Sequence, residues 1–374
     1  MTLRVARIVL REIALPLREP FRISSGVTRE RRILLVELFD PDGAAAWGEC
    51  VAGEHPNYSP ETIDTCRHAL KEWLAPLVLG HAFARAADIG PTLDAPVRGH
   101  RMAKAALEMT CWALEAEMAG QPLAAVLGGT RREIPVGISL GIQSNPAALV
   151  ERALAARAEG YRRVKLKIMP GADVAFVAAV REALPDQVLS VDANAAYHPD
   201  DAEHLAELDR FRLAMIEQPL EPEDLRRHAE LQRRLETPLC LDESITSPAR
   251  AEDAVVMGSA RIVNIKPGRV GGHGPAKGVH DVCAGHGIPV WCGGMLESGI
   301  GRAHNVALAS LANFSLPGDL SPSARYWERD IVTPEWTMSP DGLVRVPFDR
   351  PGLGVTVDRD RVADLTVRTD ELAA

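Results

Sequence analysis

The stretch Tyr161-Arg-Arg-Val-Lys-Leu-Lys-Ile168 carries two lysines on an apolar run of the length of a β-strand. Four later apolar runs also end on a charged residue. Counted from Lys167, these residues follow after 25, 25, 25 and 24 positions, at Asp192, Glu217, Asp242 and Lys266. This interval fits one strand, one helix and two short loops, so it predicts successive parallel βα units. Each charged side chain is then expected at the same end of the sheet.

The sequences around these positions support the prediction. The apolar runs are Val188–Asp192, Leu213–Glu217, Leu239–Asp242 and Arg261–Lys266, and Val136–Leu140 is expected as an earlier strand. Each of the four runs is followed by a residue typical of a turn or a helix N-cap and then by a helical pattern. The charges therefore lie at the carboxyl ends of strands. In a closed parallel barrel, this is the face at which catalytic groups gather.

The order of the strands places the charges around one point. If Val136–Leu140 is the first strand, the three acids close the third, fourth and fifth strands, which are neighbours about 4.8 Å apart. Their carboxylates are therefore expected to converge on one cation. The lysines belong to the second and sixth strands, which are opposite each other in a ring of eight. The sequence predicts a metal site between two candidate bases.

The chemistry of these groups favours removal of a proton next to a carboxylate. Oxygen ligands from Asp192, Glu217 and Asp242 suit a hard cation such as Mg²⁺, or Mn²⁺ in its place. A metal and a nearby ammonium stabilise the enediolate that forms when the α-proton of a carboxylate is removed. A free lysine, with a pKa of about 10.4, is a weak base at neutral pH, but neighbouring positive charges lower this pKa. Lys165 would act in this way on Lys167, Arg269 would act on Lys266, and the bound cation would act on both. Values nearer about 7 to 8 would make either lysine a workable acid or base.

Each signal also has an ordinary interpretation. A lone Lys-x-Lys is more often a solvated strand end, and a lone acid after a strand is usually a helix cap. Asn194, two residues after Asp192, fits a cap as well as a group that orients a ligand. Glu243 is expected to hold a lysine or a metal ligand in place. The functional interpretation rests on all the charged groups occurring in one register.

The rest of the chain suggests a second domain. With 374 residues, it exceeds the roughly 250 of a bare barrel. Residues 1–127 contain alternating strand patterns followed by helical stretches, which predicts an α+β domain over the barrel of residues 128–320. The segment 321–374 is expected to complete this first domain. The strand patterns of the first domain are Thr2–Ile13, Arg32–Asp40 and Ala45–Cys50, and its helical stretches are Ser59–Leu77 and Met102–Met118.

Composition excludes several classes of function. No apolar run approaches the roughly 20 residues of a membrane span, and the N-terminus lacks the pattern of a signal peptide, so a cytoplasmic protein is expected. A net charge of −9 argues against a nucleic-acid partner or an anionic membrane surface. The six cysteines are scattered, with no CxxC spacing, and are expected to be ordinary buried thiols.

A glycine-rich segment, Trp291-Cys-Gly-Gly-Met-Leu-Glu-Ser-Gly-Ile-Gly-Arg302, follows the next strand region and leads into a helix. Its glycines permit close approach of the backbone, and a helix N-terminus offers N–H groups to an anion. The spacing is wrong for a dinucleotide fingerprint. The segment is therefore expected to face the substrate, with a simple turn as the alternative.

Taken together, the motifs resemble those of the enolase superfamily, in its muconate-lactonizing subgroup. The resemblance covers nearly the whole chain. Gly293–Asn305, with Leu316-Pro-Gly-Asp319 and Arg325-Tyr-Trp327, is similar to the o-succinylbenzoate synthase and N-acylamino acid racemase branch. The superfamily motifs are Val164-Lys-Leu-Lys167, Val191-Asp-Ala-Asn194, Ile216-Glu-Gln-Pro219, Leu241-Asp-Glu-Ser244 and Asn264-Ile-Lys266.

The resemblance implies a modified TIM barrel, (β/α)7β, under an N-terminal α+β capping domain. It implies Mg²⁺ on the three acids, an acid/base pair of Lys167 and Lys266, and Lys165 near the enediolate oxygen. Loops around 21–28 and 54–58 would close the site, where Ser25 and Gly53 replace the bulkier apolar residues of many relatives. The substrate-binding residues expected are Asn194, Ser139, Tyr58, Gly294, Met295 and Leu296.

Two reactions fit this site. Racemisation of an N-acylamino acid, in particular an N-succinylamino acid, needs one lysine on each face of the α-carbon. Dehydration to o-succinylbenzoate, a menaquinone precursor, needs only one lysine. Muconate cycloisomerase, dipeptide epimerase and a non-catalytic ligand-binding barrel are the alternatives. The partners expected are a small carboxylate substrate and further copies of the chain in a homo-oligomer.

Overall fold

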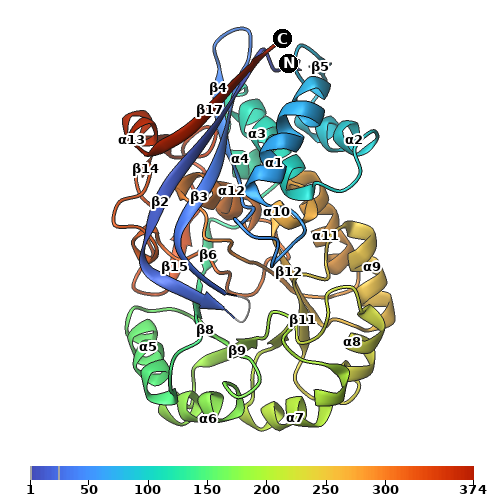
Figure 1. The fold of residues 1–374 in the computed structure, drawn as a ribbon, viewed down its shortest axis with the longest axis vertical. Helices are drawn as coiled ribbons and strands as arrows, with labels where there is room; N and C mark the ends of the chain where they lie inside the picture. Colours follow the sequence, from blue (N-terminus) through green and yellow to red (C-terminus); the bar gives the residue numbers. More distant parts are fainter. Residues whose placement is uncertain (1, 24–25) are drawn as a thin grey trace.

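A computed structural model describes residues 2–23 and 26–374, and its centre is a barrel of parallel strands. Seven strands are hydrogen-bonded in the order β13-β12-β11-β10-β9-β8-β7. Helices cover the outside of the sheet, as the lower half of Figure 1 shows. The strands are β7 (Gly137–Leu140), β8 (Arg163–Lys167), β9 (Val188–Asp192), β10 (Ile216–Glu217), β11 (Leu239–Leu241), β12 (Ile262–Ile265) and β13 (Val290–Cys292).

An extended segment at residues 316–319 takes the eighth place in the ring. The Gly318 carbonyl accepts a hydrogen bond from the Gly137 N–H at 2.7 Å, which joins the segment to β7. On its other side, the Asp319 N–H donates to the Cys292 carbonyl at 2.9 Å, which joins it to β13. The barrel is therefore closed, and the predicted (β/α)7β fold is confirmed.

Five helices of the barrel, α5, α6, α8, α9 and α12, begin at a side-chain cap. The Asn145 side chain accepts from the Ala148 N–H at the start of α5, and the Ser247 side chain caps α9 in the same way. The helices are α5 (Pro146–Ala158), α6 (Val174–Ala183), α7 (Ala202–Ala206), α8 (Leu225–Gln232), α9 (Pro248–Met257), α10 (Pro267–Val270), α11 (His273–Gly285) and α12 (Gly299–Leu308). These caps hold the loops at the carboxyl ends of the strands, where the charged residues lie.

A second layer covers the barrel and is built on a four-stranded antiparallel sheet in the order β17-β2-β3-β4. The long hairpin of β2 and β3 descends from this sheet toward the barrel strands (Figure 1). There, the Arg22 carbonyl accepts from the Ile142 N–H at 3.1 Å. The elements are β1 (Leu3–Arg4), β2 (Arg7–Ile23), β3 (Gly26–Phe39), β4 (Ala45–Cys50), α1 (Ile63–Ala69), β5 (Ala82–Phe83), α2 (Ile89–Asp94), α3 (Arg101–Met118) and α4 (Leu123–Leu127).

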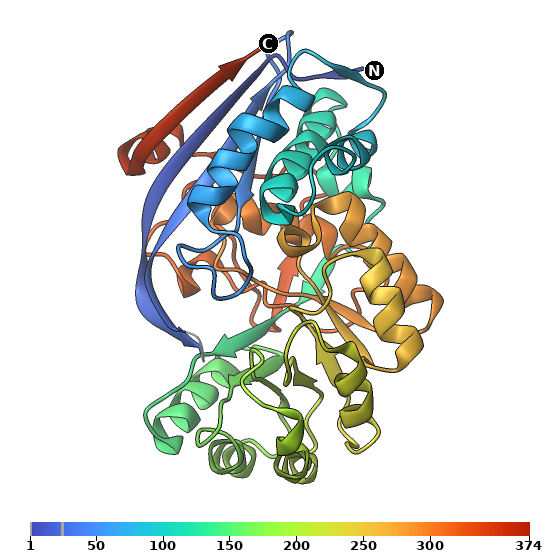
Figure 2. The ribbon, with the colours of Figure 1, turned by 45° about the vertical axis from the view of Figure 1, so that its right-hand side comes forward.

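The C-terminal segment returns to this sheet, because β17 pairs along β2 from Thr366 to Ala373. Figure 2 shows the returning strand on the outer side of the hairpin. We propose the division into a capping unit of residues 1–127 with 321–374 and a barrel of residues 128–320, which this pairing supports. The remaining elements are β6 (Glu133–Pro135), β14 (Val332–Thr333), β15 (Leu343–Arg345), β16 (Thr356–Val357) and α13 (Arg359–Leu365).

Several expected elements have different bounds. The first strand pattern, Thr2–Ile13, is divided into β1 and β2, and β2 continues to Ile23. The expected strand Arg32–Asp40 begins already at Gly26, because the β2/β3 hairpin extends beyond the sheet. The helical stretch Ser59–Leu77 begins only at Ile63, where Thr62 forms a capping box, and continues after Ala69 as a short π-helix and then a 3-10 turn. Among the described residues, no helix is long and apolar enough to cross a membrane. All six cysteines are buried and unpaired, as predicted.

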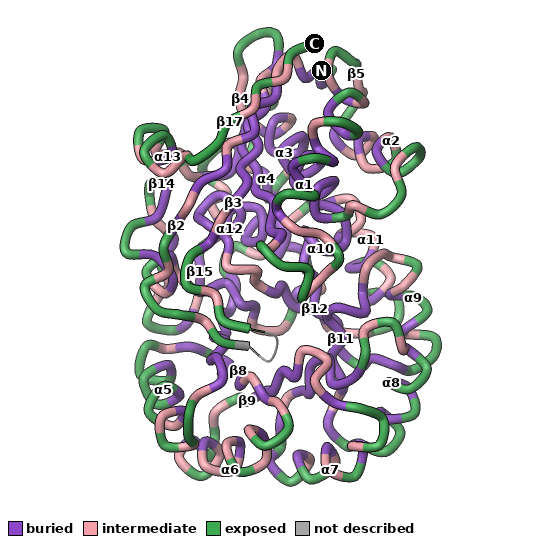
Figure 3. Tube along the Cα trace, viewed as in Figure 1, coloured by how far each residue is buried: buried purple, intermediate pink, exposed green. Residues whose placement is uncertain are grey.

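The core runs through both layers. Buried apolar side chains of the capping sheet, α3, the barrel strands and α12 form one continuous cluster. Figure 3 shows this buried zone along the centre of the molecule, with exposed residues on the outer helices. The cap is therefore packed on the barrel over a wide apolar contact, and the site lies where the two layers meet.

Candidate active site

The charged residues of the repeat lie side by side at the carboxyl ends of the strands. In the register of the sheet, Lys167 on β8 is level with Asp192 on β9, and Asp192 is level with Glu217 on β10. Asp242 follows directly after β11, and Lys266 directly after β12, at the position that precedes α10. All five side chains are almost fully removed from solvent. The convergence predicted from the 25-residue interval is therefore present.

Lys165 lies at the centre of three carboxylates. Its Nζ is 2.8 Å from Asp319 Oδ2, 2.9 Å from Glu217 Oε2 and 3.2 Å from Asp192 Oδ2. It also lies 4.7 Å from the centre of the Trp291 ring. Burial lowers the pKa of Lys165, but the three carboxylates outweigh burial and hold this pKa well above its ordinary value. Lys165 is therefore a fixed positive charge in the floor of the site.

Lys167 is held by two residues of the β9 end. Its Nζ donates to Asp192 Oδ2 at 2.6 Å and to Asn194 Oδ1 at 2.7 Å. Asn194 in turn donates from Nδ2 to Glu243 Oε1 at 2.9 Å. Asn194 thus contacts Lys167 directly, and Glu243 stands behind Asn194, which fits the expectation that Glu243 holds a lysine in place.

Lys266 lies opposite Lys167 in the ring of barrel strands. Its Nζ donates to Asp242 Oδ2 at 2.7 Å and to the Tyr58 hydroxyl at 3.1 Å, and it lies 4.5 Å from the centre of the Tyr58 ring. Arg269 forms an ion pair with the other oxygen of Asp242. Tyr58 comes from the capping unit, so Lys266 is positioned by both layers.

The pKa of Lys266 is set by its charged neighbours. Burial lowers it, but Asp242, Tyr58 and Glu243 outweigh burial and the opposing Arg269, so that the pKa of Lys266 lies above its ordinary value. The main reason is that Asp242 pairs directly with the ammonium. The value of about 7 to 8, which assumes a cation on the acids, stays a prediction.

Several residues at this face have a strained backbone. Asn194, Gln218 and Leu296 have φ angles of +44°, +38° and +57°, in the left-handed region that residues with a side chain rarely adopt. Each follows a barrel strand. Gln218 holds its position through its side chain, which accepts from the N–H groups of Asp242 and Ser244 at 3.0 and 3.2 Å. Such strain is common at functional sites.

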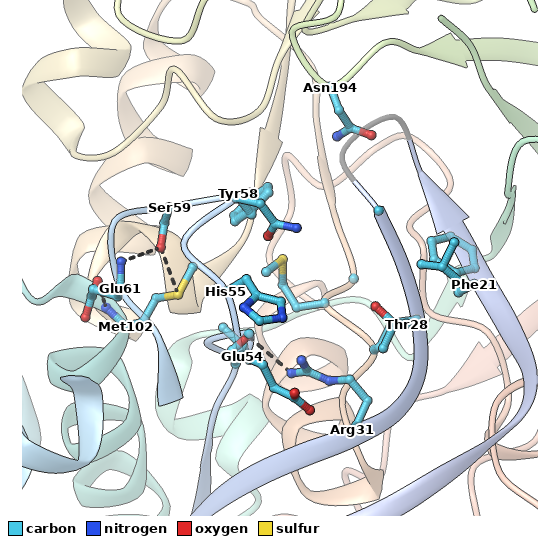
Figure 4. Close-up of a pocket in the computed structure, with 18 of the residues that line it drawn as sticks. Phe21, Thr28, Arg31, Glu54, His55, Tyr58, Ser59, Glu61, Met102 and Asn194 are labelled. Carbon is cyan, nitrogen blue, oxygen red and sulfur yellow. Dashed lines mark hydrogen bonds between the residues drawn. The ribbon is translucent and has the colours of Figure 1, made fainter. Parts of the chain in front are cut away.

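A cavity of about 480 Å³ opens above the two lysines, within the range of small-molecule sites. Its barrel wall includes Lys167, Asn194 and Lys266, and the glycine-rich loop adds Gly294, Met295 and Leu296. Its cap wall includes the side chains of Phe21, Thr28, Arg31, Tyr58 and Met102, and Figure 4 shows these side chains around the space.

The structure brings together most, but not all, of the predicted substrate-binding residues. Ser139 is buried on β7, level with Lys165, and is not part of the cavity wall. Gly53 lines the cavity, and a Cβ at this position would come no closer than 3.7 Å to a residue beyond its chain neighbours, which is an ordinary contact. Ser25 lies outside the described residues.

The donor set fits a hard divalent cation. Oxygens of Asp192 and Glu217 already approach one positive charge, the Lys165 ammonium, so these carboxylates reach a common point. Glu217 also accepts from Asn264 Nδ2 at 2.8 Å, which orients its second oxygen. Within residues 2–23 and 26–374, no group of three or more acid, histidine or cysteine side chains is gathered as a preformed metal cluster, because lysines and Arg269 pair with the acids.

Sequence reasoning missed two residues that contact this site. Asp319, known only as part of a motif, binds Lys165 and also pairs with the fully buried Arg163 at 2.7 Å. Asn264 could have been found, since it lies two residues before Lys266 and therefore on the same face of the strand. No local signal identifies Asp319, because its segment has no strand pattern of its own.

Both halves of the chain match known family models. Residues 5–128 match the mandelate racemase / muconate lactonizing enzyme N-terminal domain, and residues 148–361 match the enolase C-terminal domain-like model. An o-succinylbenzoate synthase of Geobacillus kaustophilus is 49% identical over 366 residues, which cover 98% of this chain and 97% of that protein. An N-succinylamino acid racemase of Amycolatopsis sp is 50% identical over 354 residues, which cover 94% and 95%.

Solved structures agree with these matches. An enolase superfamily protein from Listeria innocua superposes with a TM-score of 0.95 at 40% identity, covering 99% of both chains. A muconate lactonizing enzyme from Pseudomonas fluorescens reaches a TM-score of 0.92 at 24% identity, covering 97% of this chain and 99% of that one. The second likeness concerns the fold alone.

Proposed function

The chain belongs to the enolase superfamily, as a member of the family of o-succinylbenzoate synthases and N-succinylamino acid racemases, and we propose on this premise that Lys167 and Lys266 are its acid and base. The observation that carries the proposal is the placement of these two lysines at opposite sides of one cavity. A carboxylate substrate between them presents its α-carbon to one ammonium or amine on each face.

Each lysine has a defined part in the proposed reaction. Lys167 removes or returns a proton on one face of the α-carbon, and Lys266 does so on the other. Lys165, held among acids in the floor, adds a positive charge toward which the negative charge of the enediolate develops. Tyr58 closes the site from the cap and orients Lys266. Asn194 contacts Lys167 and Tyr58 contacts Lys266 independently of the three acids, so these contacts keep both lysines in position for proton transfer.

Asp192, Glu217 and Asp242 are proposed to hold Mg²⁺, with Mn²⁺ as a substitute. When bound, the cation would supply positive charge for the carboxylate of the substrate and would draw the acids away from their lysine partners. The support is the chemistry of three hard oxygen donors at neighbouring strand ends. Loss of the acid partner lowers the pKa of a lysine, which favours its action as a base.

Two reactions remain open for the same groups. Racemisation of an N-succinylamino acid uses both lysines, and dehydration to o-succinylbenzoate uses one lysine first as base and then as acid. Relatives of 44 to 50% identity carry the one name or the other. Muconate cycloisomerase and dipeptide epimerase are less supported, because those likenesses rest on the fold.

The first experiment follows the α-proton of N-succinylamino acids by proton NMR in D₂O, with purified protein and Mg²⁺. Loss of the α-proton signal is expected, and a control with excess chelator should show none. Chirality and dehydration assays then separate racemase from synthase. Absence of exchange with every N-succinylamino acid would count against the racemase.

We also propose the location, the assembly and the metabolic role of the enzyme. A cytoplasmic location, a homo-oligomer and a role in menaquinone synthesis follow from the resemblance to the family. Gel filtration with light scattering would test the assembly. Genes for menaquinone enzymes beside this gene would favour the synthase, and genes for an acylase or a succinyltransferase would favour the racemase.

A further inference from the structure

Positive charge stands at both ends of the active-site cavity. Lys167 and Lys266 form the barrel end, and Arg31 lies in the wall of the cap end. Arg31 comes from β3 and is only 7% exposed. Figure 4 shows its guanidinium pointing toward His55, between Thr28 and Glu54. The cavity therefore offers a second buried cation away from the catalytic lysines.

Arg31 has few partners inside the protein. Its Nη2 donates to the carbonyls of Val51 and Ala52 at the long distances of 3.3 and 3.4 Å, and its Nε is buried without an acceptor. Arg31 makes no ion pair with any carboxylate in the part of the chain that the structure describes. A buried guanidinium is normally paired, because the loss of water around an unpaired charge is costly.

Two buried acids near Arg31, Glu49 and Glu297, are committed to other contacts. Glu49 accepts hydrogen bonds from the Ser298 hydroxyl at 2.5 Å and from the Gly301 N–H at 3.1 Å. Burial raises the pKa of Glu49 to about 8, so at neutral pH this acid is mainly protonated. Glu297 accepts from Asn305 Nδ2 at 2.7 Å. The exposed Glu54 of the cavity wall also acts on Arg31 through its charge. Since none of these acids forms an ion pair with Arg31 in the described part of the chain, its guanidinium can bind a ligand.

We propose that Arg31 binds the distal carboxylate of a succinyl-bearing substrate whose reacting carboxylate lies at the lysine end. The inference rests on the proposed function and names the part of the substrate that the cap recognises. The two names carried by the relatives, o-succinylbenzoate synthase and N-succinylamino acid racemase, both describe a succinyl group attached to a second, carboxylate-bearing part. A single guanidinium therefore serves both reactions.

The chemistry of Arg31 suits this task. A guanidinium presents a planar fork of N–H groups that matches the two oxygens of a carboxylate. Because Arg31 is buried, little water competes for the contact, and the attraction is stronger than at the surface. A neutral acyl group of the same size would leave the buried guanidinium unpaired. Arg31 is thus inferred to determine specificity for a dicarboxylate, without contact to the reacting α-carbon.

The test compares N-succinylalanine with its amide, N-succinamylalanine, which has the same shape and no distal charge. Calorimetry gives the dissociation constants of both compounds with the Mg²⁺-loaded wild type and Arg31→Gln. Wild type is expected to prefer the succinyl compound by at least about tenfold, and Arg31→Gln is expected to lose most of this preference while binding of the amide stays the same. The control is Arg22→Gln, which removes one positive charge at an exposed position of β2 outside the cavity wall. This variant should keep the preference for the succinyl compound.

The proposal is overturned if wild type binds the succinyl compound and its amide with nearly equal dissociation constants. It is also overturned if Arg31→Gln loses the same affinity for both compounds. If Arg31→Gln does not unfold cooperatively, Arg31→Lys replaces it. This variant keeps the charge without the fork and should lower the preference at least about threefold. An unchanged preference in whichever variant folds also overturns the proposal. Because the readout is binding, it is independent of α-proton exchange, whose absence would count against the proposed function alone.

Discussion

Asn194→Ala is expected to slow proton transfer on one face of the substrate only. The side chain of Asn194 accepts from Lys167 at 2.7 Å and is itself fixed by Glu243 at 2.9 Å. Without it, Lys167 keeps a single anchor, Asp192 at 2.6 Å, and its Nζ is free to turn toward that acid. Lys266 shares no contact with Asn194 and keeps its own partners, Asp242 and Tyr58.

The magnitude follows from the contact that is lost. A hydrogen bond to a charged group contributes about 1.5 to 3 kcal/mol. If this energy holds Lys167 in its reactive position, its removal slows the step at Lys167 by about ten- to 150-fold, at about 1.4 kcal/mol for each factor of ten. Alanine at a φ of +44° adds backbone strain, so Asn194→Gly, which tolerates this φ, serves as the matched variant.

The assay is exchange of the α-proton in D₂O, measured separately for each enantiomer of an N-succinylamino acid. Exchange of the enantiomer whose proton faces Lys167 should fall by the factor given above, in Asn194→Ala and Asn194→Gly alike. Exchange of the other enantiomer should stay within about twofold of wild type. Racemisation should fall in both directions, since it needs both lysines. An equal loss of exchange for the two enantiomers, or no loss for either, would refute the reasoning.

Three further results are expected. Tyr58→Phe removes the hydroxyl 3.1 Å from Lys266. In the same assay, it should slow exchange of the enantiomer whose α-proton faces Lys266 by about tenfold. Gly53→Leu should narrow the cavity and lower kcat/KM for N-succinylphenylalanine relative to N-succinylalanine by about tenfold, and an unchanged ratio would contradict the position of Gly53 in the wall. Glu49 has a folded pKa of about 8, above its unfolded value of about 4.3, so its contribution to stability is full below pH 4.3 and is lost as the pH rises to 8. Urea unfolding should therefore show the stability of wild type falling relative to Glu49→Gln by up to about 1.4 kcal/mol per pH unit across this window, whereas a constant difference would contradict the raised pKa.

Much of the barrel could be predicted because parallel βα units impose a regular interval on the sequence. The spacing of Lys167, Asp192, Glu217, Asp242 and Lys266 is sufficient to place them at one face, and the structure brings them together there. Identification of the family came from the residues around these positions. The spacing of these five charged residues thus predicts the fold, and their chemistry indicates the site.

Other features depend on contacts that local patterns do not encode. Asp319 reaches Lys165 from an extended segment without strand assignment, so neither its position nor its partner is visible in the sequence. The sign of the pKa shift of Lys266 depends on whether Asp242 or a cation is its neighbour, which the spacing of residues leaves open. The burial of Arg31 follows from the packing of the cap on the barrel, because the pattern of β3 alone places it beside other charged residues.

The central claim is that Lys167 and Lys266 act on opposite faces of one α-carbon, and single-lysine variants test it most directly. Lys167→Ala and Lys266→Ala are each incubated in D₂O with the separate enantiomers of an N-succinylamino acid, after calorimetry has established that Mg²⁺ still binds. Each variant is expected to have no measurable racemisation and to exchange the α-proton of one enantiomer only, with the two variants sparing opposite enantiomers. Retained racemisation in either variant, or exchange of the same enantiomer by both, would contradict the account.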